Sequence, residues 1–327
     1  MNVNHARYHG QPGGFYESYF LRANHPSRPL AFWLRYTLFA PKDAAAAAVG
    51  EVWAVWFNGE TGAHVVAKEE FPLAACGFDT VGFQVTVGES MLEAGHATGA
   101  VALDGHTLSW DLRFTGDAPP LLLLPPRLYE TRFPAAKSLV SLPLARYSGT
   151  LQADGEPHDI RDWIGSQNHN WGTRHTDLYA WGQVAGFDTH PDSFLEVATA
   201  RLRLGPVWTP PFTLLVLRHR GREYALNGLA RAVRARGSFG YFRWEFRSRS
   251  AEAEIAGEIT APGEAFVGLN YYNPPGGTKH CLNSKLAHCR LVLRDARAGE
   301  TEVLETAHRA AFEILTDDRD HGVALRA

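Results

Sequence analysis

The sequence has only three cysteines, Cys76, Cys281 and Cys289, among 327 residues. An odd, low number of cysteines argues against a disulfide framework and favours a reducing compartment. No apolar run approaches the length of a membrane-spanning helix, and the first residues lack the apolar core of a signal peptide. The formal net charge of −3 gives no electrostatic reason to expect nucleic acid or an anionic membrane as a partner. We therefore expect a soluble, cytoplasmic protein.

Several catalytic motifs are also missing. The sequence contains no GxSxG, GxGxxG or P-loop pattern, so hydrolase, dinucleotide-binding and NTPase functions have no motif support. The pairs His280–Cys281 and His288–Cys289 are eight residues apart. That spacing spans roughly 26 Å on a strand and about 12 Å on a helix, too far for both pairs to bind one ion. We expect neither a cofactor nor a metal.

One arginine-rich stretch needs a separate interpretation. Six arginines alternate with aromatic residues between positions 231 and 249, a pattern that could stack on nucleic acid. Acidic residues follow at Glu252 and Glu254 and could pair with these arginines across a hairpin, which favours a solvated strand face and no nucleic acid partner. The stretch LLLLPPRL (121–128) is too short to span a membrane, although peripheral contact stays open. The sequence does not indicate an oligomeric state.

Residue patterns typical of β-strands, in contrast, are abundant in the sequence. Short aromatic and β-branched segments such as LAFWLRYTLFAP and GEVWAVWFNGE are bounded by turn residues, as in LDGH and RHRGRE. Helix candidates are the alanine run 44–48 and ETEVLETAHRAAFEIL, and the latter could equally be a strand. Many short strands predict an all-β protein of antiparallel barrels or sandwiches. The length suggests two halves that join near 160–180, with the proline-rich stretch 117–137 as a crossing loop.

The stretch GSQNHNWGTRHTDLYAWGQ (165–183) is rich in aromatic and amide side chains. Because side chains alternate along a strand, each of two successive strands gathers such residues on one face. The first strand carries Trp163, Gln167, His169 and Trp171, and the second carries Tyr179, Trp181, Gln183 and Phe187. Such faces suit the wall of a ligand cavity, because a barrel of about eight strands can hold one small ligand. A tryptophan-rich core whose polar groups satisfy one another is the alternative.

A second constellation lies near the N-terminus. Arg35 shares a strand face with Trp33, and Glu51 shares one with Trp53. If the two strands form a hairpin, Arg35 and Glu51 can lie opposite each other, and a buried charge among aromatic rings needs such a partner. The pair could simply fix strand register. Alternatively, Glu51 is a lumenal acid with a raised pKa that serves in proton transfer.

The segment NHNWG…YAWGQVAGFD resembles the lipocalin-like family of carotenoid 1,2-hydratases and AttH-like proteins and, more remotely, tocopherol cyclases. The matching residues are Asn170, Trp171, Gly172, Tyr179, Trp181, Gln183 and Phe187. FYESYFLRA, LSWDLRF and NYYNPPGGTKHCLNSKLAHCRL also resemble the family, so the likeness covers most of the chain. It implies two lipocalin-like antiparallel β-barrel domains packed together, which we place at 1–172 and 173–327.

The resemblance also implies a style of chemistry: hydration, cyclisation or isomerisation of a hydrophobic isoprenoid or polyketide-like metabolite in a barrel cavity. An acid kept protonated by apolar surroundings would protonate an alkene, and aromatic faces would stabilise the resulting cation by about 0.5–2 kcal/mol each. The candidate catalytic residues are Asp177, Asp162, Glu51 and His169. The candidate ligand-binding residues are Trp163, Gln167, Asn168, Asn170, Trp171, Tyr179, Trp181, Gln183, Arg35 and Trp53.

Three of the candidate catalytic residues also have a structural explanation that involves no catalysis. Asp177 follows GTRHT and suits a turn, Asp162 lies by parity opposite Trp163 and could be solvated, and His169 could be a hydrogen-bonded structural residue. At the level of the whole protein, a non-catalytic carrier or sensor of a hydrophobic ligand is the alternative to an enzyme. A carrier needs no proton-transfer residue inside its cavity, whereas an enzyme of this kind does.

Overall fold

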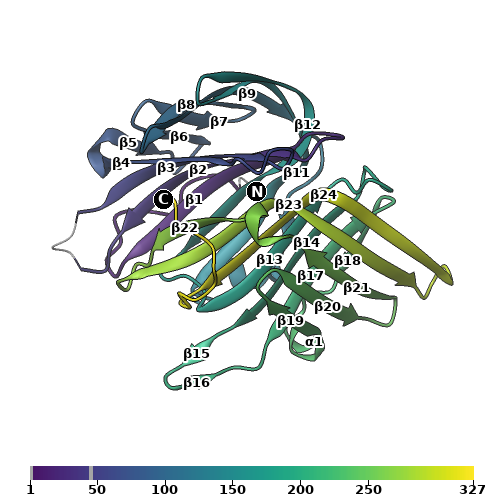
Figure 1. Cartoon of the computed structure of the whole chain (residues 1–327). Helices are drawn as coiled ribbons and strands as arrows, with labels where there is room; N and C mark the ends of the chain where they lie inside the picture. Colours follow the sequence, from purple (N-terminus) through teal and green to yellow (C-terminus); the bar gives the residue numbers. More distant parts are fainter. Residues whose placement is uncertain (1–2, 44–46) are drawn as a thin grey trace.

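The computed structural model describes residues 3–43 and 47–327 and is almost entirely β-structure (Figure 1). Two antiparallel sheets dominate, and each curls into a barrel-like lobe. The predicted all-β fold with two barrels is therefore confirmed. We call the sheet built from β1 to β12 the first barrel and the sheet built from β13, β14 and β17 to β24 the second barrel.

The first barrel runs in the order β4-β3-β2-β1-β12-β11-β9-β8-β7-β6-β5, and β10 pairs with β11. Its strands are β1 (Phe15–Asn24), β2 (Leu30–Ala40), β3 (Val49–Asn58), β4 (Val65–Pro72), β5 (Cys76–Phe78), β6 (Gln84–Val87), β7 (Ser90–Glu93), β8 (His96–Leu103), β9 (His106–Thr115), β10 (Leu121–Leu122), β11 (Ala136–Ala153) and β12 (Glu156–Gly172).

The second barrel runs in the order β18-β17-β14-β13-β24-β23-β21-β20-β19, and β22 pairs with β23. Its strands are β13 (Leu178–Ala185), β14 (Phe194–Arg201), β17 (Phe212–His219), β18 (Arg222–Ala225), β19 (Arg236–Gly240), β20 (Arg243–Arg249), β21 (Ala253–Thr260), β22 (Val267–Tyr272), β23 (Thr278–Asp295) and β24 (Glu300–Thr316). A separate small hairpin joins β15 (Arg203–Leu204) and β16 (Val207–Trp208).

Strand pairing thus changes sheet between Gly172 and Leu178. We propose domain boundaries of 1–172 and 173–327 on this basis. Separate expression of the two pieces would test this division.

The described helices are short: α1 (Leu229–Arg234), η1 (Leu73–Ala75), η2 (Pro126–Tyr129) and η3 (Gly263–Ala265). None of them is long and apolar enough to cross a membrane. The stretch 300–316 forms β24, so the strand alternative for it is correct. Of the predicted helix at 44–48, residues 44–46 lie outside the described residues, and residues 47 and 48 are not helical.

Hairpin turns form where the sequence signals them. Asp104 and Gly105 in LDGH have φ values of 51° and 86°, and Arg220 and Gly221 in RHRGRE have 49° and 72°. Two successive residues with positive φ match the twist of two-residue antiparallel hairpins. The arginine-rich strands carry ion pairs, as expected: Arg247 binds Glu254 at 2.7 Å. Glu252, in contrast, pairs with arginines of other segments.

Each barrel encloses a core of its own. Tyr19, Phe32 and Trp163 pack inside the first barrel, and Phe187, Trp244 and Phe312 pack inside the second. A further cluster joins the barrels, where Trp33 and Trp53 of the first meet Tyr271 of the second. Side chains therefore fill both lumens, and the outer faces of β1, β2 and β3 are buried by the second barrel (Figure 1).

A candidate active site between the two barrels

A cavity of about 190 Å³ lies between the two barrels. This corrects the expectation of a cavity inside one barrel, because both lumens are filled by their own cores. The aromatic part of its wall comprises Tyr16, Phe20, Trp33, Phe133, Tyr179, Trp181, Phe212 and Tyr271. The aliphatic part includes Leu123, Leu124, Leu128, Leu202, Leu214 and Leu229. The wall is therefore mostly apolar, as is typical of sites for small organic molecules.

The strands that build this wall are buried on both faces. In β1, Phe15, Tyr19 and Leu21 point into the first barrel, whereas Tyr16 and Phe20 point toward the second. All ten residues of β1 are buried. This arrangement follows from the side-chain period of two, with one face serving the lumen and the other serving the interface between barrels.

Arg35 places a cation in the wall. Its guanidinium lies over the ring of Tyr271, with Cζ 4.1 Å from the ring centroid. The side chain is buried, and its Nε has no hydrogen-bond partner within the described part of the chain. A buried donor without a partner is costly, so the guanidinium is poised to bind an acceptor atom that enters the cavity.

His175 places a neutral ring beside this cation. It packs on Tyr16 at a centroid distance of 4.1 Å and donates from Nε2 to the carbonyl oxygen of Tyr272 at 3.1 Å. Burial, together with the charge of Arg35, lowers the pKa of His175 to about 3. The ring therefore stays neutral at physiological pH, and its Nδ1 offers a lone pair for hydrogen bonding.

Glu313 is the acidic residue in the wall, and Lys285 is its partner at 2.7 Å. The ammonium of Lys285 lies 5.8 Å from the ring centroid of Trp33 and 5.5 Å from that of Trp181. Burial lowers the pKa of Lys285, while Glu313 opposes that effect. A buried carboxylate and ammonium thus sit together against aromatic faces.

A second buried acid, Glu196, lies behind Trp181. It accepts hydrogen bonds from Trp181 Nε1 at 2.8 Å and from Gln183 Nε2 at 2.9 Å. Burial raises its pKa to about 7, and these hydrogen bonds only partly offset that rise. Glu196 is not part of the cavity wall, but it reaches the site through its hydrogen bonds to Trp181 and Gln183 and through its charge interaction with Glu313.

Gln183 continues this polar network across the interface. Ser166 donates to its Oε1 at 2.6 Å, and Gln183 Nε2 donates to Asn168 Oδ1 at 2.9 Å. Arg22 of β1 donates to the backbone oxygen of Gln183 at 3.1 Å. The amide-rich character of residues 165–183 is therefore used largely to join the two barrels.

Four of the predicted ligand-binding residues line the cavity: Arg35, Asn170, Tyr179 and Trp181. Three more lie directly behind the wall, since Asn168 and Gln183 belong to the polar network and Trp53 packs edge-on against Tyr271 at 5.7 Å. These residues gather at the interface between the barrels.

The remaining predicted ligand-binding residues lie on the other face of β12: Trp163, Gln167 and Trp171. They share a face with His169, as parity predicts, but that face points into the first barrel. Phe187 likewise belongs to the core of the second barrel and does not share the face of Tyr179, because β13 ends at Ala185 and Gly186 adopts a φ of 75°.

His169 is fully buried and has two partners. Its Nε2 contacts Glu17 Oε1 at 2.8 Å, and its Nδ1 contacts the carbonyl oxygen of Val3 at 2.8 Å. Glu17 also accepts from the backbone of Arg7 and Tyr8. These contacts attach the N-terminal segment to the barrel, and His169 does not line the cavity.

None of the three predicted acids lines the cavity. The side chain of Asp162 is 72% exposed and pairs loosely with Arg146 at 3.4 Å. Asp177 serves the turn before β13, where it binds Arg174 at 2.5 Å and accepts from the backbone of Arg203 at 2.9 Å.

Glu51, the third acid, is buried, and burial raises its pKa. It pairs with Lys68 at 2.6 Å and lies opposite Thr37 in the ladder. Arg35 lies opposite Trp53, which is two residues from Glu51. The predicted pairing of Arg35 with Glu51 across the hairpin is therefore wrong by two residues. The fourth strand, which brings Lys68, supplies the nearer cation.

Four residues of the site were not predicted from the sequence: His175, Tyr271, Glu196 and Glu313. A usable signal existed for the two acids, because each is a lone carboxylate within an apolar run, SFLEVATA and AAFEILT. Both strands are buried on both faces, which such runs favour. Nothing in the local sequence marks His175 or Tyr271 as neighbours, since they lie almost a hundred residues apart.

No family model and no curated protein matches the sequence. Solved structures do match over nearly the whole chain. An AttH-like protein from Nitrosomonas europaea aligns at a TM-score of 0.53 with 13% identity, covering 93% of this chain and 92% of that one. The chain shares its two-barrel fold. Kievitone hydratase from Nectria haematococca aligns at 0.56 with 13% identity over 94% and 91%, and CghA at 0.53 with 12% identity over 93% and 88%.

Proposed function

We propose that the cavity between the barrels is the active site of a cofactor-independent enzyme that hydrates, cyclises or isomerises a hydrophobic, unsaturated metabolite. The observation that carries this proposal is an apolar, aromatic cavity whose wall also contains a buried guanidinium, Arg35, and a buried carboxylate, Glu313. A simple lipid pocket needs neither charge. The name of one structural relative, kievitone hydratase, supports a reaction of this class.

Arg35 is assigned to substrate binding. The guanidinium keeps its charge at any physiological pH and has an unpaired buried Nε. A carbonyl, phenolate or carboxylate oxygen of the substrate would satisfy it and would be polarised in return. The substrate would accordingly combine a hydrophobic body with at least one oxygen function.

Glu313 and Tyr179 are assigned to proton transfer. Lys285 balances the negative charge of Glu313, so this carboxylate can accept a proton from water or from the substrate. Burial holds the pKa of Tyr179 well above its ordinary value of 10.0, so this residue keeps its hydroxyl proton and can donate it in a hydrogen bond. Tyr179 and Glu313 project from one face of the neighbouring strands β13 and β24. Glu313 would take a proton from water as the water oxygen adds to the double bond and would return that proton to the neighbouring carbon, while Tyr179 donates a hydrogen bond to the substrate.

Aromatic faces would stabilise any cation that forms. The rings of Trp33 and Trp181 already lie near the ammonium of Lys285, and the ring of Tyr271 lies under Arg35. Each such contact is worth roughly 0.5–2 kcal/mol, more when water is excluded. These faces would therefore favour partial positive charge on the carbon that water attacks, which a substrate oxygen bound to Arg35 would create.

The experiment begins with native mass spectrometry of the full chain and identification of the co-purified ligand. That ligand, or a panel of hydrophobic alkenes that carry a carbonyl or phenol, is then incubated with the protein in heavy-oxygen water. We expect a product that contains one heavy oxygen if the protein is a hydratase, and an isomer of unchanged mass if it is a cyclase or isomerase. Binding without any product would overturn the proposal in favour of a carrier.

Three variants test the assignments: Arg35→Met, Tyr179→Phe and Glu313→Gln. We expect each to lower turnover by about 10²-fold or more. Asp162→Asn is the matched control, because Asp162 is an exposed acid outside the cavity and asparagine tolerates its positive φ of 54°. Full activity of all three cavity variants, with folded structure verified by circular dichroism, would contradict the proposal.

A further inference from the structure

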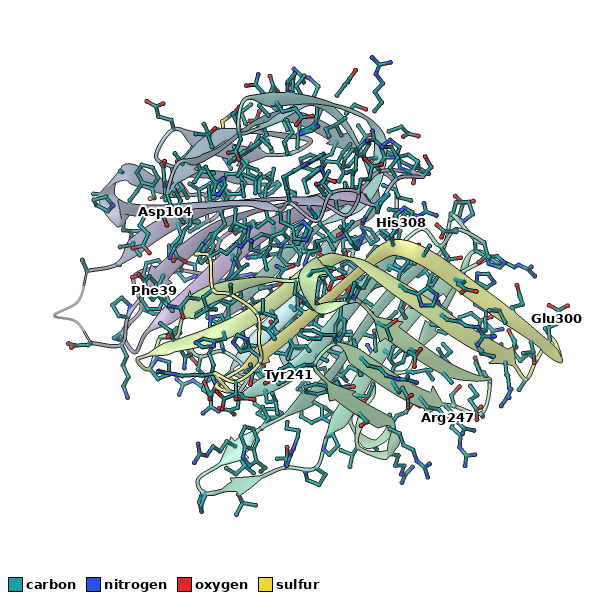
Figure 2. The ribbon with its side chains drawn as sticks, in the orientation of Figure 1. Phe39, Asp104, Tyr241, Arg247, Glu300 and His308 are labelled. Atoms are coloured by element: carbon teal, nitrogen blue, oxygen red, sulfur yellow. The ribbon has the colours of Figure 1, made fainter. Side chains whose placement is uncertain are left out.

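Three side chains that commonly bind metals meet at one end of the second barrel, away from the cavity. His190 lies in the connection between β13 and β14, His219 ends β17, and Glu302 lies near the start of β24. Figure 2 labels Glu300, two residues from Glu302, at the far tip of the β23–β24 hairpin. None of the three side chains lines the cavity wall. They are far apart in sequence, which is why no spacing motif reveals them.

The distances fit a single ion. Nε2 of His219 lies 3.3 Å from Glu302 Oε2, and Nε2 of His190 lies 3.5 Å from the same atom. One ligand atom from each residue lies within 4.8 Å of the other two. Bonds of about 2.0–2.2 Å in a tetrahedral zinc site place neighbouring ligand atoms roughly 3.3–3.5 Å apart. Two histidines and one glutamate, with a fourth position open, form a common zinc donor set.

Hydroxyl groups orient both imidazole rings. Nδ1 of His219 is 2.8 Å from Ser193 Oγ, and Nδ1 of His190 is 3.0 Å from Thr189 Oγ1. When each Nδ1–H donates to its hydroxyl, each Nε2 presents a lone pair toward the space beside Glu302. In that tautomer, the two lone pairs and the carboxylate oxygen converge on a position that suits a cation; without a metal, a proton on His219 Nε2 can bind Glu302 instead.

The histidine-bearing loop is held in place without any ion. The backbone of His190 pairs with that of Phe187 in both directions, at 3.1 and 3.2 Å. Asp188 attaches the loop to β24 by accepting from the backbone of Ala307 at 2.7 Å and from Arg309 Nε at 2.8 Å. The ligands are therefore preorganised, which a binding site requires.

Arg220 is the competing cation. Its Nη2 lies 2.9 Å from Glu302 Oε2, but its side chain is 62% exposed. An exposed ion pair contributes little and breaks readily. A divalent ion would displace this arginine into solvent, whereas the buried His219 and its hydroxyl partner would stay in place.

We propose that His190, His219 and Glu302 bind one Zn²⁺ ion at the end of the second barrel, with water in the fourth position. The ion would join the β13–β14 connection, β17 and β24, and would stabilise that end of the barrel. The proposal is independent of the function proposed for the cavity, because the two sites share no residue.

The test is a calorimetric titration of the chelator-treated full chain with ZnCl₂. We expect one equivalent to bind the wild type and to raise its melting temperature, and we expect Co²⁺ in the same site to give the visible absorption of a tetrahedral complex. His190→Gln and Glu302→Gln should each weaken Zn²⁺ binding by at least about tenfold. His190 is on a partly exposed turn, so its variant should fold even if variants of buried His219 do not.

His288→Gln is the matched control. His288 lies on the same barrel and contacts Glu305 at 2.9 Å, but in the described part of the chain no second histidine joins them to form a metal-binding group. This variant should bind Zn²⁺ like the wild type. Equal Zn²⁺ affinity in the wild type and His190→Gln, or loss of binding only in His288→Gln, would overturn the proposal. Failure of the turnover experiments on the cavity would leave this result unaffected.

Discussion

At the scale of single residues, two buried glutamates at the interface differ in their neighbours. Glu313 has the ammonium of Lys285 at 2.7 Å. Among the described residues, Glu196 accepts side-chain hydrogen bonds from Trp181 and Gln183 and forms no ion pair. Because burial without a direct counter-charge favours the neutral acid, the pKa of Glu196 rises to about 7.

This difference predicts the pH dependence of stability. Between pH 4.5 and 7 the folded chain keeps a proton on Glu196 that the unfolded chain has lost, so this group's contribution to stability falls as pH rises and is lowest above about pH 7. The total effect is about 3 kcal/mol. Glu196→Gln should therefore gain stability relative to the wild type as pH rises from about 5 to about 8.

Urea unfolding of both proteins at the two pH values measures the effect. Glu245→Gln is the control, because Glu245 is an exposed strand residue. A stability difference between wild type and Glu196→Gln that does not change with pH would show that Glu196 is ionised throughout.

His169 predicts a contrast between stability and activity. His169→Phe removes contacts to Glu17 and to the carbonyl of Val3, which leaves two buried acceptors with fewer donors. We expect a loss of roughly 3 kcal/mol in unfolding free energy with unchanged turnover in the folded fraction. His175→Phe, in the cavity wall, removes one hydrogen bond, to the carbonyl oxygen of Tyr272, so it should lower turnover with a smaller loss of stability. A stable but inactive His169→Phe protein would return His169 to the catalytic candidates.

That alternate residues of a strand share a face was predictable from the sequence, but which face points into the barrel was not. Trp163, Gln167, His169 and Trp171 do share a face, as the period of two requires. On a strand that is buried on both sides, however, polarity does not tell which face points into the lumen. Only the long-range pairing of β12 with β1 and β11 decides this.

At the scale of elements, β12 depends on a close backbone approach at Gly165. A Cβ added there would lie 1.8 Å from the carbonyl oxygen of Arg22 and 2.7 Å from Ala23 Cα. Both atoms belong to the backbone of β1, which cannot move without breaking its ladders. The glycine at the start of the amide-rich stretch thus sets the distance between β12 and β1.

We predict that Gly165→Ala lowers the unfolding free energy by about 3 kcal/mol or more, since overpacking against backbone relaxes poorly. Gly240→Ala is the matched control, because Gly240 is also in a strand and a Cβ there would meet nothing within 4 Å. Equal stability of the two variants in urea would contradict this account of β12.

Strands bounded by characteristic turn residues were predictable from the sequence, whereas short segments and segments with an ambiguous pattern were not. Asp104–Gly105 marks its hairpin because both residues need positive φ. The stretch 300–316 could be a helix or a strand by pattern, and pairing with β13 and β23 decides for the strand. Helix α1 has six residues, too few for a periodic signal.

At the scale of the whole molecule, β1 carries the polar side chains that hold the barrels together. Arg22 donates to Gln183 and to the carbonyl of Arg309 at 3.0 Å, and Asn24 donates to the carbonyl of Lys285 at 2.7 Å. Asn24 also reaches the carbonyl of His308, which Figure 2 labels on β24 beside the upper barrel. These contacts satisfy buried backbone oxygens of the second barrel.

Arg22→Met should leave the oxygens of Gln183 and Arg309 unpaired and cost about 3 kcal/mol or more. We also expect faster hydrogen exchange in β1 and β13, because the barrels separate more readily. Arg28→Met is the control, since Arg28 forms an exposed ion pair with Glu60 and should cost less than about 1 kcal/mol. Similar exchange rates in the two variants would show that apolar packing alone joins the barrels.

The two-barrel fold was within reach of the sequence because turn spacing, strand patterning and the family resemblance agree. The position of the cavity was not, since its wall combines β1, β2, β12, β13, β14, β17, β22, β24, α1 and the 123–138 segment. Such a site exists only once both barrels are in place. Residues that act together there, such as Arg35 and Tyr271, have no local signature.

The connection 123–135, between β10 and β11, has a consequence for how this protein can diversify. It contributes Leu123, Leu124, Leu128 and Phe133 to the cavity wall, yet it belongs to neither barrel core. Loops tolerate substitution better than cores. Changes in its length or bulk would therefore reshape the space available to a substrate while both barrels kept their stability. If the cavity takes a substrate as proposed, evolution or a designer can alter its selectivity here separately from foldability.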